Sequence, residues 1–229
     1  MNSSISERIV SIRSSLPTSV KLIAVSKQVP AQAIRSAYNA GIRDFAESRI
    51  QEAASKQAEL QDLPDITWHF IGHLQSNKAK KAIEQFPWIH SVDNLKLAQR
   101  LDQLAQQLGV SPQVCLQVKI LPDPNKSGWS VPELLADLPT LNQYKSLQIQ
   151  GLMTIPPSGL NDPEILNVFN LNRELAKKIR EQNWSHIKMQ HLSMGMSGDY
   201  ELAVQAGATM VRLGTILFGD RQTAFDYQP

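Results

Sequence analysis

Short apolar runs alternate with longer amphipathic segments along most of the chain. The short runs are rich in Val, Ile and Leu, as expected of strands buried on both faces, and the longer segments repeat their apolar residues at helical spacing. Such alternation predicts a parallel sheet whose strands are connected by helices. The predicted strands are Lys21–Lys27, Asp44–Glu47, Thr67–Gly72, Ile89–Asp93, Gln113–Ile120, Ile149–Thr154, Met189–Met194 and Thr209–Leu213.

The predicted helices fill the intervals between these strands, and one further helix precedes the first strand. Their ends carry residues that helix termini favour. Gly41 and Gly109 follow two helices at positions that need a left-handed residue, and Asn94 and Asp162 are the expected N-caps. The predicted helices are Ser6–Ser15, Ala31–Ala40, Arg49–Leu60, Ser76–Phe86, Leu95–Leu108, Val131–Tyr144, Glu164–Gln182 and Tyr200–Ala206.

The number of strand–helix units predicts the architecture. Eight units of about 25–30 residues each account for the whole length of 229 residues. We therefore expect an α/β fold of the (β/α)8 TIM-barrel type, with an extra N-terminal helix and a single domain over residues 1–229. Alternation does not prove that the sheet closes, and an open doubly wound sheet fits nearly as well.

Composition and charge exclude several classes of function. The net charge is +2, from 23 basic and 21 acidic side chains, which gives no general attraction to nucleic acid or to acidic membranes. Cys115 is the one cysteine and cannot form an internal disulfide, so we interpret it as a small buried hydrophobe in a reducing compartment. The N-terminus lacks a signal-peptide core, and no apolar run approaches a membrane span of about 20 residues. We expect a soluble, cytoplasmic protein.

Lys27 closes the first predicted strand, which is otherwise apolar. In parallel barrels, functional residues gather where the strands end at their carboxyl edge. A desolvated lysine has a lowered pKa and can act as a nucleophile toward an aldehyde. The alternative is a lysine that reaches solvent at the barrel rim, and this strand alone does not decide between them.

The loop after the seventh strand reads Leu-Ser-Met-Gly-Met-Ser-Gly-Asp and precedes a predicted helix. Small residues before a helix allow backbone N–H groups to approach an anion, and Ser193 and Ser197 add hydroxyl donors. An ordinary flexible loop in which Ser197 caps the helix is also compatible with this sequence.

Arg212 lies within the apolar run of the eighth strand and needs a partner or a ligand if it is buried. Gly214 and Thr215 follow it and offer backbone donors. Phosphate sites built from the loops after strands seven and eight recur in barrels. The two loops together therefore predict an anion site more strongly than either loop alone.

Two histidines belong to the third strand and its rim. His69 alternates with apolar neighbours, and we interpret it as a hydrogen-bonded core histidine. His73 follows Gly72 at the rim and is the better candidate for a ligand contact. No residues have metal-ligand spacing, and neither a P-loop nor a GxGxxG motif is present, so no metal or nucleotide site is expected.

These motifs together resemble the YggS/PROSC family of pyridoxal phosphate homeostasis proteins. The resemblance extends over almost the whole chain, and the order and spacing of the segments agree throughout. The matching segments are Ala24–Pro30, Phe45–Glu52, Trp68–Lys78, Ser91–Asp93, Lys126–Gly128, Gly151–Thr154, Leu192–Ser197, Val211–Gly214 and Phe218–Gly219.

The resemblance implies a fold-type III barrel, like the N-terminal domain of alanine racemase, in which Lys27 holds pyridoxal 5′-phosphate (PLP) as a Schiff base. It also implies that the loop 193–197 and the turn at Gly214 bind the phosphate, with Arg212 near the ring nitrogen or the phosphate. Ala46 and Ser48 replace the usual Gly and Asn, which leaves one cofactor contact open. The candidate cofactor-binding residues are Lys27, Ser48, His73, Met153, Ser193, Met194, Gly195, Ser197, Arg212, Gly214 and Thr215.

Two functions are consistent with such a site. The first is a PLP carrier that stores, buffers or delivers the cofactor without turnover of its own, with PLP-requiring apoenzymes as partners. The second is a PLP-dependent amino-acid racemase. Racemisation by two bases needs proton donors on both faces of the substrate, and alanine racemase takes one of them from a separate C-terminal domain for which the predicted barrel leaves no room. We therefore favour the carrier, as a monomer or a weak dimer.

Overall fold

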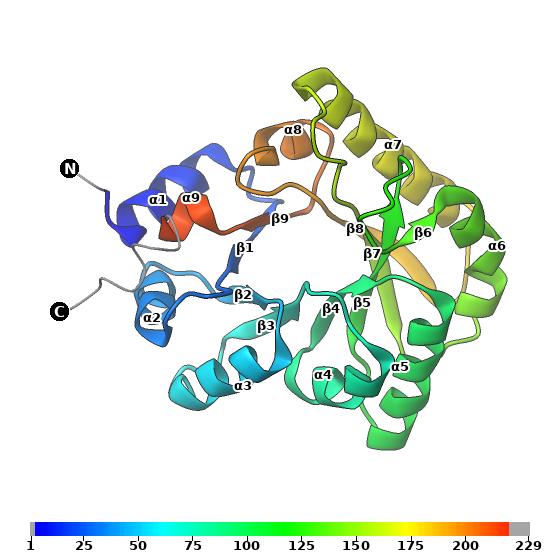
Figure 1. Cartoon of the computed structure of the whole chain (residues 1–229), viewed down its shortest axis with the longest axis horizontal. Helices are drawn as coiled ribbons and strands as arrows, with labels where there is room; N and C mark the ends of the chain where they lie inside the picture. Colours follow the sequence, from blue (N-terminus) through cyan, green and yellow to red (C-terminus); the bar gives the residue numbers. More distant parts are fainter. Residues whose placement is uncertain (1–2, 220–229) are drawn as a thin grey trace.

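A closed ring of eight parallel strands forms the centre of the protein (Figure 1). The computed structural model describes residues 3–219. Around the ring, β1 pairs with β2 and β9, and β4 pairs with β5. The ring consists of β1 (Lys21–Val25), β2 (Asp44–Glu47), β3 (Thr67–Phe70), β4 (Trp88–Val92), β5 (Gln113–Lys119), β7 (Gln148–Met153), β8 (Ile187–Ser193) and β9 (Met210–Leu213). The barrel prediction is confirmed, and the open-sheet alternative is wrong.

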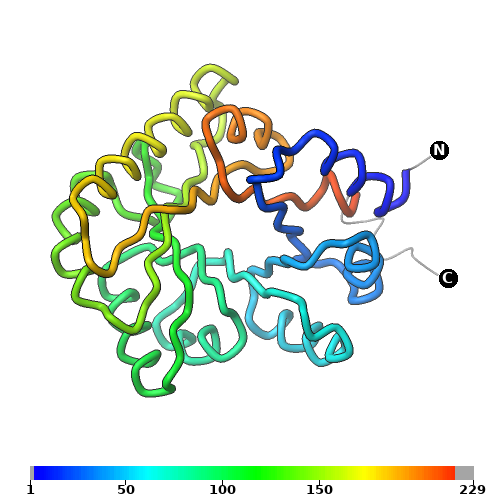
Figure 2. Tube along the Cα trace, turned by 180° about the vertical axis from the view of Figure 1, so that it is seen from behind, coloured from blue at the N-terminus to red at the C-terminus, as the bar shows by residue number. Residues whose placement is uncertain are grey.

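Helices surround this ring on the outside, as both views of the chain show (Figures 1 and 2). The added N-terminal helix α1 begins with a capping box between Ser4 and Glu7 and packs on α2 and α9. The helices are α1 (Ile5–Ser15), α2 (Ala31–Asn39), α3 (Ile50–Glu59), α4 (Ala79–Gln85), α5 (Leu95–Leu108), α6 (Val131–Leu141), α7 (Asp162–Arg180), α8 (Tyr200–Gln205) and α9 (Thr215–Phe218). None of the described helices is long and apolar enough to cross a membrane.

Two apolar clusters hold the fold together. The larger lies between the strands and the helices and includes Ile34, Phe45 and Leu101. The smaller one fills the inside of the barrel, where side chains from alternate positions of neighbouring strands meet. Its buried members are Ile23, Val25, Ala46, Trp88, Cys115, Met153 and Met210. Cys115 is fully buried there, as predicted, and burial raises the pKa of its thiol to about 12.

Several element boundaries differ from those predicted. β1 ends at Val25, so Lys27 lies in the turn that follows and not in the strand. The N-cap of α7 is Asn161 and not Asp162, because the capping box requires a partner three residues later and Glu164 supplies it. The short strand β6 (Trp129–Ser130) and α9 were missed, since elements of two and four residues carry no periodic signal. Gly41 and Gly109 have φ of 93° and 67°, as expected.

Candidate functional site

A cavity of about 310 Å³ opens at the carboxyl ends of the barrel strands. Its walls combine apolar side chains with an amine, a guanidinium and two hydroxyl groups, which is the usual composition of a small-molecule site. Six of the predicted site residues line it together, although they come from four separate parts of the chain. These are Lys27, Met153, Ser197, Arg212, Gly214 and Thr215.

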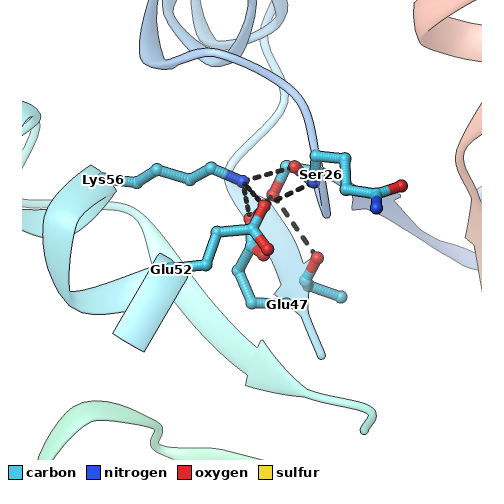
Figure 3. A network of polar contacts seen from close by, with 6 residues as sticks. Ser26, Glu47, Glu52 and Lys56 are labelled. Atoms are coloured by element: carbon cyan, nitrogen blue, oxygen red, sulfur yellow. Dashed lines mark hydrogen bonds and ion pairs between the residues drawn. The ribbon is translucent and has the colours of Figure 1, made fainter. Parts of the chain in front are cut away.

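The turn that carries Lys27 is held in place by a buried polar network (Figure 3). The ammonium group of Lys56 donates to the Ser26 carbonyl at 2.7 Å and contacts the carboxylates of Glu47 at 2.8 Å and Glu52 at 2.6 Å. Ser26 also donates its hydroxyl to Glu47 at 2.7 Å. The residue before Lys27 is thus anchored to α3 through Lys56 and to the end of β2 through Glu47.

The residue after Lys27 has an uncommon backbone conformation. Gln28 has φ of 60°, which a non-glycine residue rarely adopts, and its N–H donates to the Glu52 carboxylate. The contact to Glu52 stabilises this conformation. At this turn the backbone no longer continues β1, and the Lys27 side chain lies on the cavity wall.

The electrostatics of this network depend on its burial. Burial raises the pKa of Glu47, and the charge of Lys56 only partly opposes this effect. Glu52 is also affected by burial, but its hydrogen bonds from Lys56 and Gln28 outweigh this effect and lower its pKa. Within the described residues, Oε2 of Glu47 is buried without a hydrogen-bond partner.

Arg212 is buried inside the barrel mouth, with 4% of its surface exposed. Its Nη1 donates to the Ser193 hydroxyl at 2.8 Å, and its Nη2 donates to the Thr154 carbonyl at 3.3 Å. Within residues 3–219, no carboxylate lies within ion-pair distance of the guanidinium. Burial lowers its pKa to about 10, so the group keeps its charge at neutral pH. The guanidinium has five N–H groups, and its remaining donors can serve a ligand in the cavity.

The loop between β8 and α8 meets the turn after β9 at the cavity. The hydroxyl oxygen of Ser197 accepts hydrogen bonds from the backbone N–H groups of Gly214 at 3.2 Å and Ile216 at 3.4 Å. Ser197 therefore connects the two loops that were predicted to form an anion site. It does not cap α8, whose N-cap residue is Asp199.

Five predicted site residues lie outside the cavity wall. Ser193 and Met194 are fully buried, and Gly195 has a left-handed φ of 92° and accepts the N–H of Arg212 through its carbonyl. Ser48 and His73 lie together at a separate surface pocket. His73 is exposed and contacts Asp93 at 3.0 Å.

Sequence reasoning missed most of the apolar cavity wall. Val25, Ile71 and Ile155 come from strand ends that also supply ordinary core residues, so no local pattern marks them as ligand contacts. Position at a carboxyl strand end was the one signal that could have found them. The full set missed is Val25, Val29, Ile71, Ile155, Met196, Gly198, Phe218 and Gly219.

The fold and the cavity together define a parallel barrel of the alanine racemase type. The family described as the alanine racemase N-terminal domain matches residues 2–222. The chain belongs to this family and, within it, to the group of the pyridoxal phosphate homeostasis proteins. The resemblance inferred from the sequence motifs is therefore confirmed.

Two curated relatives and three solved structures illustrate this membership. The pyridoxal phosphate homeostasis protein of Synechocystis sp. is 56% identical over 92% of this chain and 95% of its own, and that of Escherichia coli K12 is 38% identical over 90% and 87%. PipY of Synechococcus elongatus covers 94% of this chain and 100% of its own. Its PLP-free structure is 57% identical with a TM-score of 0.92, and its PLP-bound structure is 56% identical with a TM-score of 0.90. Alanine racemase of Clostridium difficile shares the fold at 16% identity and a TM-score of 0.75, over 95% of this chain and 56% of its own.

Proposed function

We propose that this chain binds PLP in the cavity at the carboxyl ends of the strands and takes part in PLP homeostasis. The observation that carries the proposal is the meeting of Lys27, Arg212 and Ser197 in one cavity with apolar walls. An amine, a buried cation and hydroxyl groups match the aldehyde, the heteroaromatic ring and the phosphate of PLP. PipY, which is 56% identical to this chain, has a solved structure with PLP bound, and this supports PLP as the ligand.

Each residue has a separate role in this proposal. Lys27 binds the cofactor aldehyde as a Schiff base, while Val25, Ile71 and Met153 provide an apolar slot for the ring. Arg212 lies against the ring nitrogen or the phosphate of PLP. When bound, PLP supplies a reactive aldehyde and an electron sink. Ser197, Gly214 and Thr215 form the phosphate end, since Ser197 already holds the two loops together.

The remaining predicted site residues take supporting positions. Ser193 accepts a hydrogen bond from the Arg212 guanidinium, Gly195 accepts one from the Arg212 backbone N–H, and Met194 is fully buried between them in sequence. Ser48 and His73, which line a separate surface pocket, are assigned no direct contact with the ring or the phosphate.

The role that we assign is storage, buffering or delivery of PLP in the cytoplasm. PLP-requiring apoenzymes would be the recipients. The names of the curated relatives support homeostasis over turnover.

Borohydride reduction tests the Schiff base directly. Purified protein should show a visible absorption band that reduction removes, and peptide mapping should then place the adduct on Lys27. Lys27→Ala should lose the band but keep a cooperative thermal transition, because the side chain lies at the rim. An adduct on another lysine would overturn the assignment.

An amino-acid racemase is the second candidate, because the barrel and the lysine are common to both classes. The cavity wall argues against it. Among the described residues that line it, Lys27 and Arg212 are the ionisable ones, and guanidinium is a poor proton acceptor. A two-base route lacks its second base there. We expect no alanine racemisation, and turnover of about 1–10³ per second would overturn this view.

A further inference from the structure

A chain of hydrogen-bonded side chains crosses the inside of the barrel and ends on Arg212. The Asp44 carboxylate lies 2.9 Å from Nε2 of His69, and Nδ1 of His69 lies 2.9 Å from Nε2 of His90. Nδ1 of His90 lies 2.7 Å from the Ser193 hydroxyl, which accepts from Nη1 of Arg212 at 2.8 Å. Each residue comes from a different strand.

This chain of hydrogen bonds, from Asp44 to Arg212, connects the two mouths of the barrel. Asp44 is the first residue of β2, is paired with Lys21 at 2.9 Å, and lines a groove at the amino ends of the strands. Arg212 lines the cavity at the carboxyl ends. His69, His90 and Ser193 between them are fully buried. The hydrogen-bond chain is therefore partly exposed to solvent at Asp44 and buried along the rest of its length.

One carboxylate fixes the direction of every hydrogen bond in the chain. Burial alone would raise the pKa of Asp44, but hydrogen bonds from His69 and Lys21 outweigh it and lower the pKa, so Asp44 is ionised. An ionised carboxylate only accepts, so His69 donates from Nε2. Burial lowers the pKa of His69 and of His90, so each ring is neutral and has one donor nitrogen and one acceptor.

The same direction continues to Arg212. The acceptor Nδ1 of His69 receives the Nε2 proton of His90, and the acceptor Nδ1 of His90 then receives the hydroxyl proton of Ser193. With its proton used in this way, the Ser193 oxygen presents lone pairs to Nη1 of Arg212. Reversal of any one bond would place two donors or two acceptors face to face.

The two imidazole rings have little freedom to leave these positions. Trp88 stacks on His69 at 5.8 Å between ring centroids and contacts His90 at 5.6 Å. Trp88 also meets His191 edge-on, at 5.4 Å between ring centroids. His191 thus shares the same aromatic layer but forms no hydrogen bond with the chain; its ring nitrogen faces Thr209 at 3.4 Å. This difference makes His191 a matched control.

We propose that Asp44, His69, His90 and Ser193 are positioning residues that orient the Arg212 guanidinium toward the bound cofactor. The inference rests on the proposed function, since Arg212 needs a cofactor to act on. A buried arginine can form hydrogen bonds to almost any backbone carbonyl. Here its Nη1 is held by the Ser193 hydroxyl, whose orientation is set by Asp44 through three hydrogen bonds, as outer partners orient the ligands of a metal.

The test is a PLP titration of apoprotein, with the visible absorption band of the bound cofactor as a second readout. His90→Gln should weaken PLP binding about 10-fold and shift the band, because the flexible amide offers Ser193 either a donor or an acceptor and no longer fixes the direction of its hydroxyl. Ser193→Ala is the smaller substitution and should have the same effect if His90→Gln folds poorly. His191→Gln should match the wild type in both readouts.

A double-mutant cycle with Arg212→Gln decides whether His90 acts through the arginine. Coupled residues are not additive, so His90→Gln combined with Arg212→Gln should bind PLP no more weakly than Arg212→Gln alone. Three outcomes would overturn the inference: additive losses of PLP affinity in the double variant, wild-type affinity in both His90→Gln and Ser193→Ala, or an equal loss of affinity in His191→Gln. Failure of the wild type itself to bind PLP would instead refute the proposed function.

Discussion

Replacing Lys56 by Met should destabilise the protein far more than the loss of an ordinary lysine. Lys56 is the cation of the buried network, and its partner Glu47 is fully buried. The substitution keeps the length of the side chain but leaves the Glu47 carboxylate without a counter-charge. Breaking a buried pair in this way costs about 3–5 kcal/mol. For a chain of this size that corresponds to a loss of roughly 6–20 °C in melting temperature.

The pH dependence of this loss has a definite sign. Burial raises the pKa of Glu47, and Lys56 is the main opposing influence. Without Lys56, the folded-state pKa rises further above that of the unfolded chain. A carboxyl with a raised folded pKa favours folding when protonated, and this contribution is lost as pH rises through the folded value. The Lys56→Met variant should therefore be closer to the wild type at pH 5 than at pH 8.

Thermal unfolding followed by circular dichroism measures both effects. Lys80→Met is the matched control, because Lys80 is exposed and lies 3.9 Å from Glu84 one helical turn away. It should change stability by less than about 0.5 kcal/mol. Combining Lys56→Met with Glu47→Gln should restore part of the loss, since the unpaired charge is gone. Equal losses for Lys56→Met and Lys80→Met, or a pH-independent loss, would refute the reasoning.

Three further expectations follow from the same structure. Arg212→Gln should weaken PLP binding about 10–100-fold in a titration, since it removes one charge-assisted hydrogen bond; equal affinity would mean that Arg212 does not face the cofactor. Gly151→Ala should fail to give a cooperative melt, because its Cβ would lie 1.8 Å from the His191 carbonyl oxygen, whereas Gly198→Ala, with nothing within 4 Å of the added carbon, should melt like the wild type. Cys115, whose pKa burial raises to about 12, should resist a thiol reagent at pH 8 until denaturant is added, and labelling of the native protein would contradict this.

Local signals in the sequence accounted for the barrel and for part of the cavity. Apolar runs and helical spacing depend on near neighbours, so the eight strands of the ring and most helices could be located within a few residues. Lys27 and Arg212 were found because a charged residue in or beside an apolar strand is conspicuous. The Ser–Gly loop around Ser197 was found by its composition, and it does line the cavity.

What the sequence could not reveal depends on partners distant along the chain. His69 was expected to be a satisfied core histidine, and it is buried between Asp44 and His90. Its partners lie on β2 and β4, and no motif links 44, 69 and 90 to each other. Lys56 appears in the sequence as one more polar residue of an amphipathic helix. Only the closed barrel places it against Glu47.

Buried polar networks hold both of the residues on which the proposed cofactor site depends. The Lys56 network fixes the turn that carries Lys27, and the chain from Asp44 fixes Arg212. Apart from Arg212 itself, the residues of the two networks do not line the cavity. Because removal of one partner leaves a buried polar group without its hydrogen bond, the residues of each network depend on one another. Transfer of the cavity-lining residues alone to another barrel of this type should therefore leave the lysine and the arginine present but poorly oriented, and restoring binding would require both networks as well.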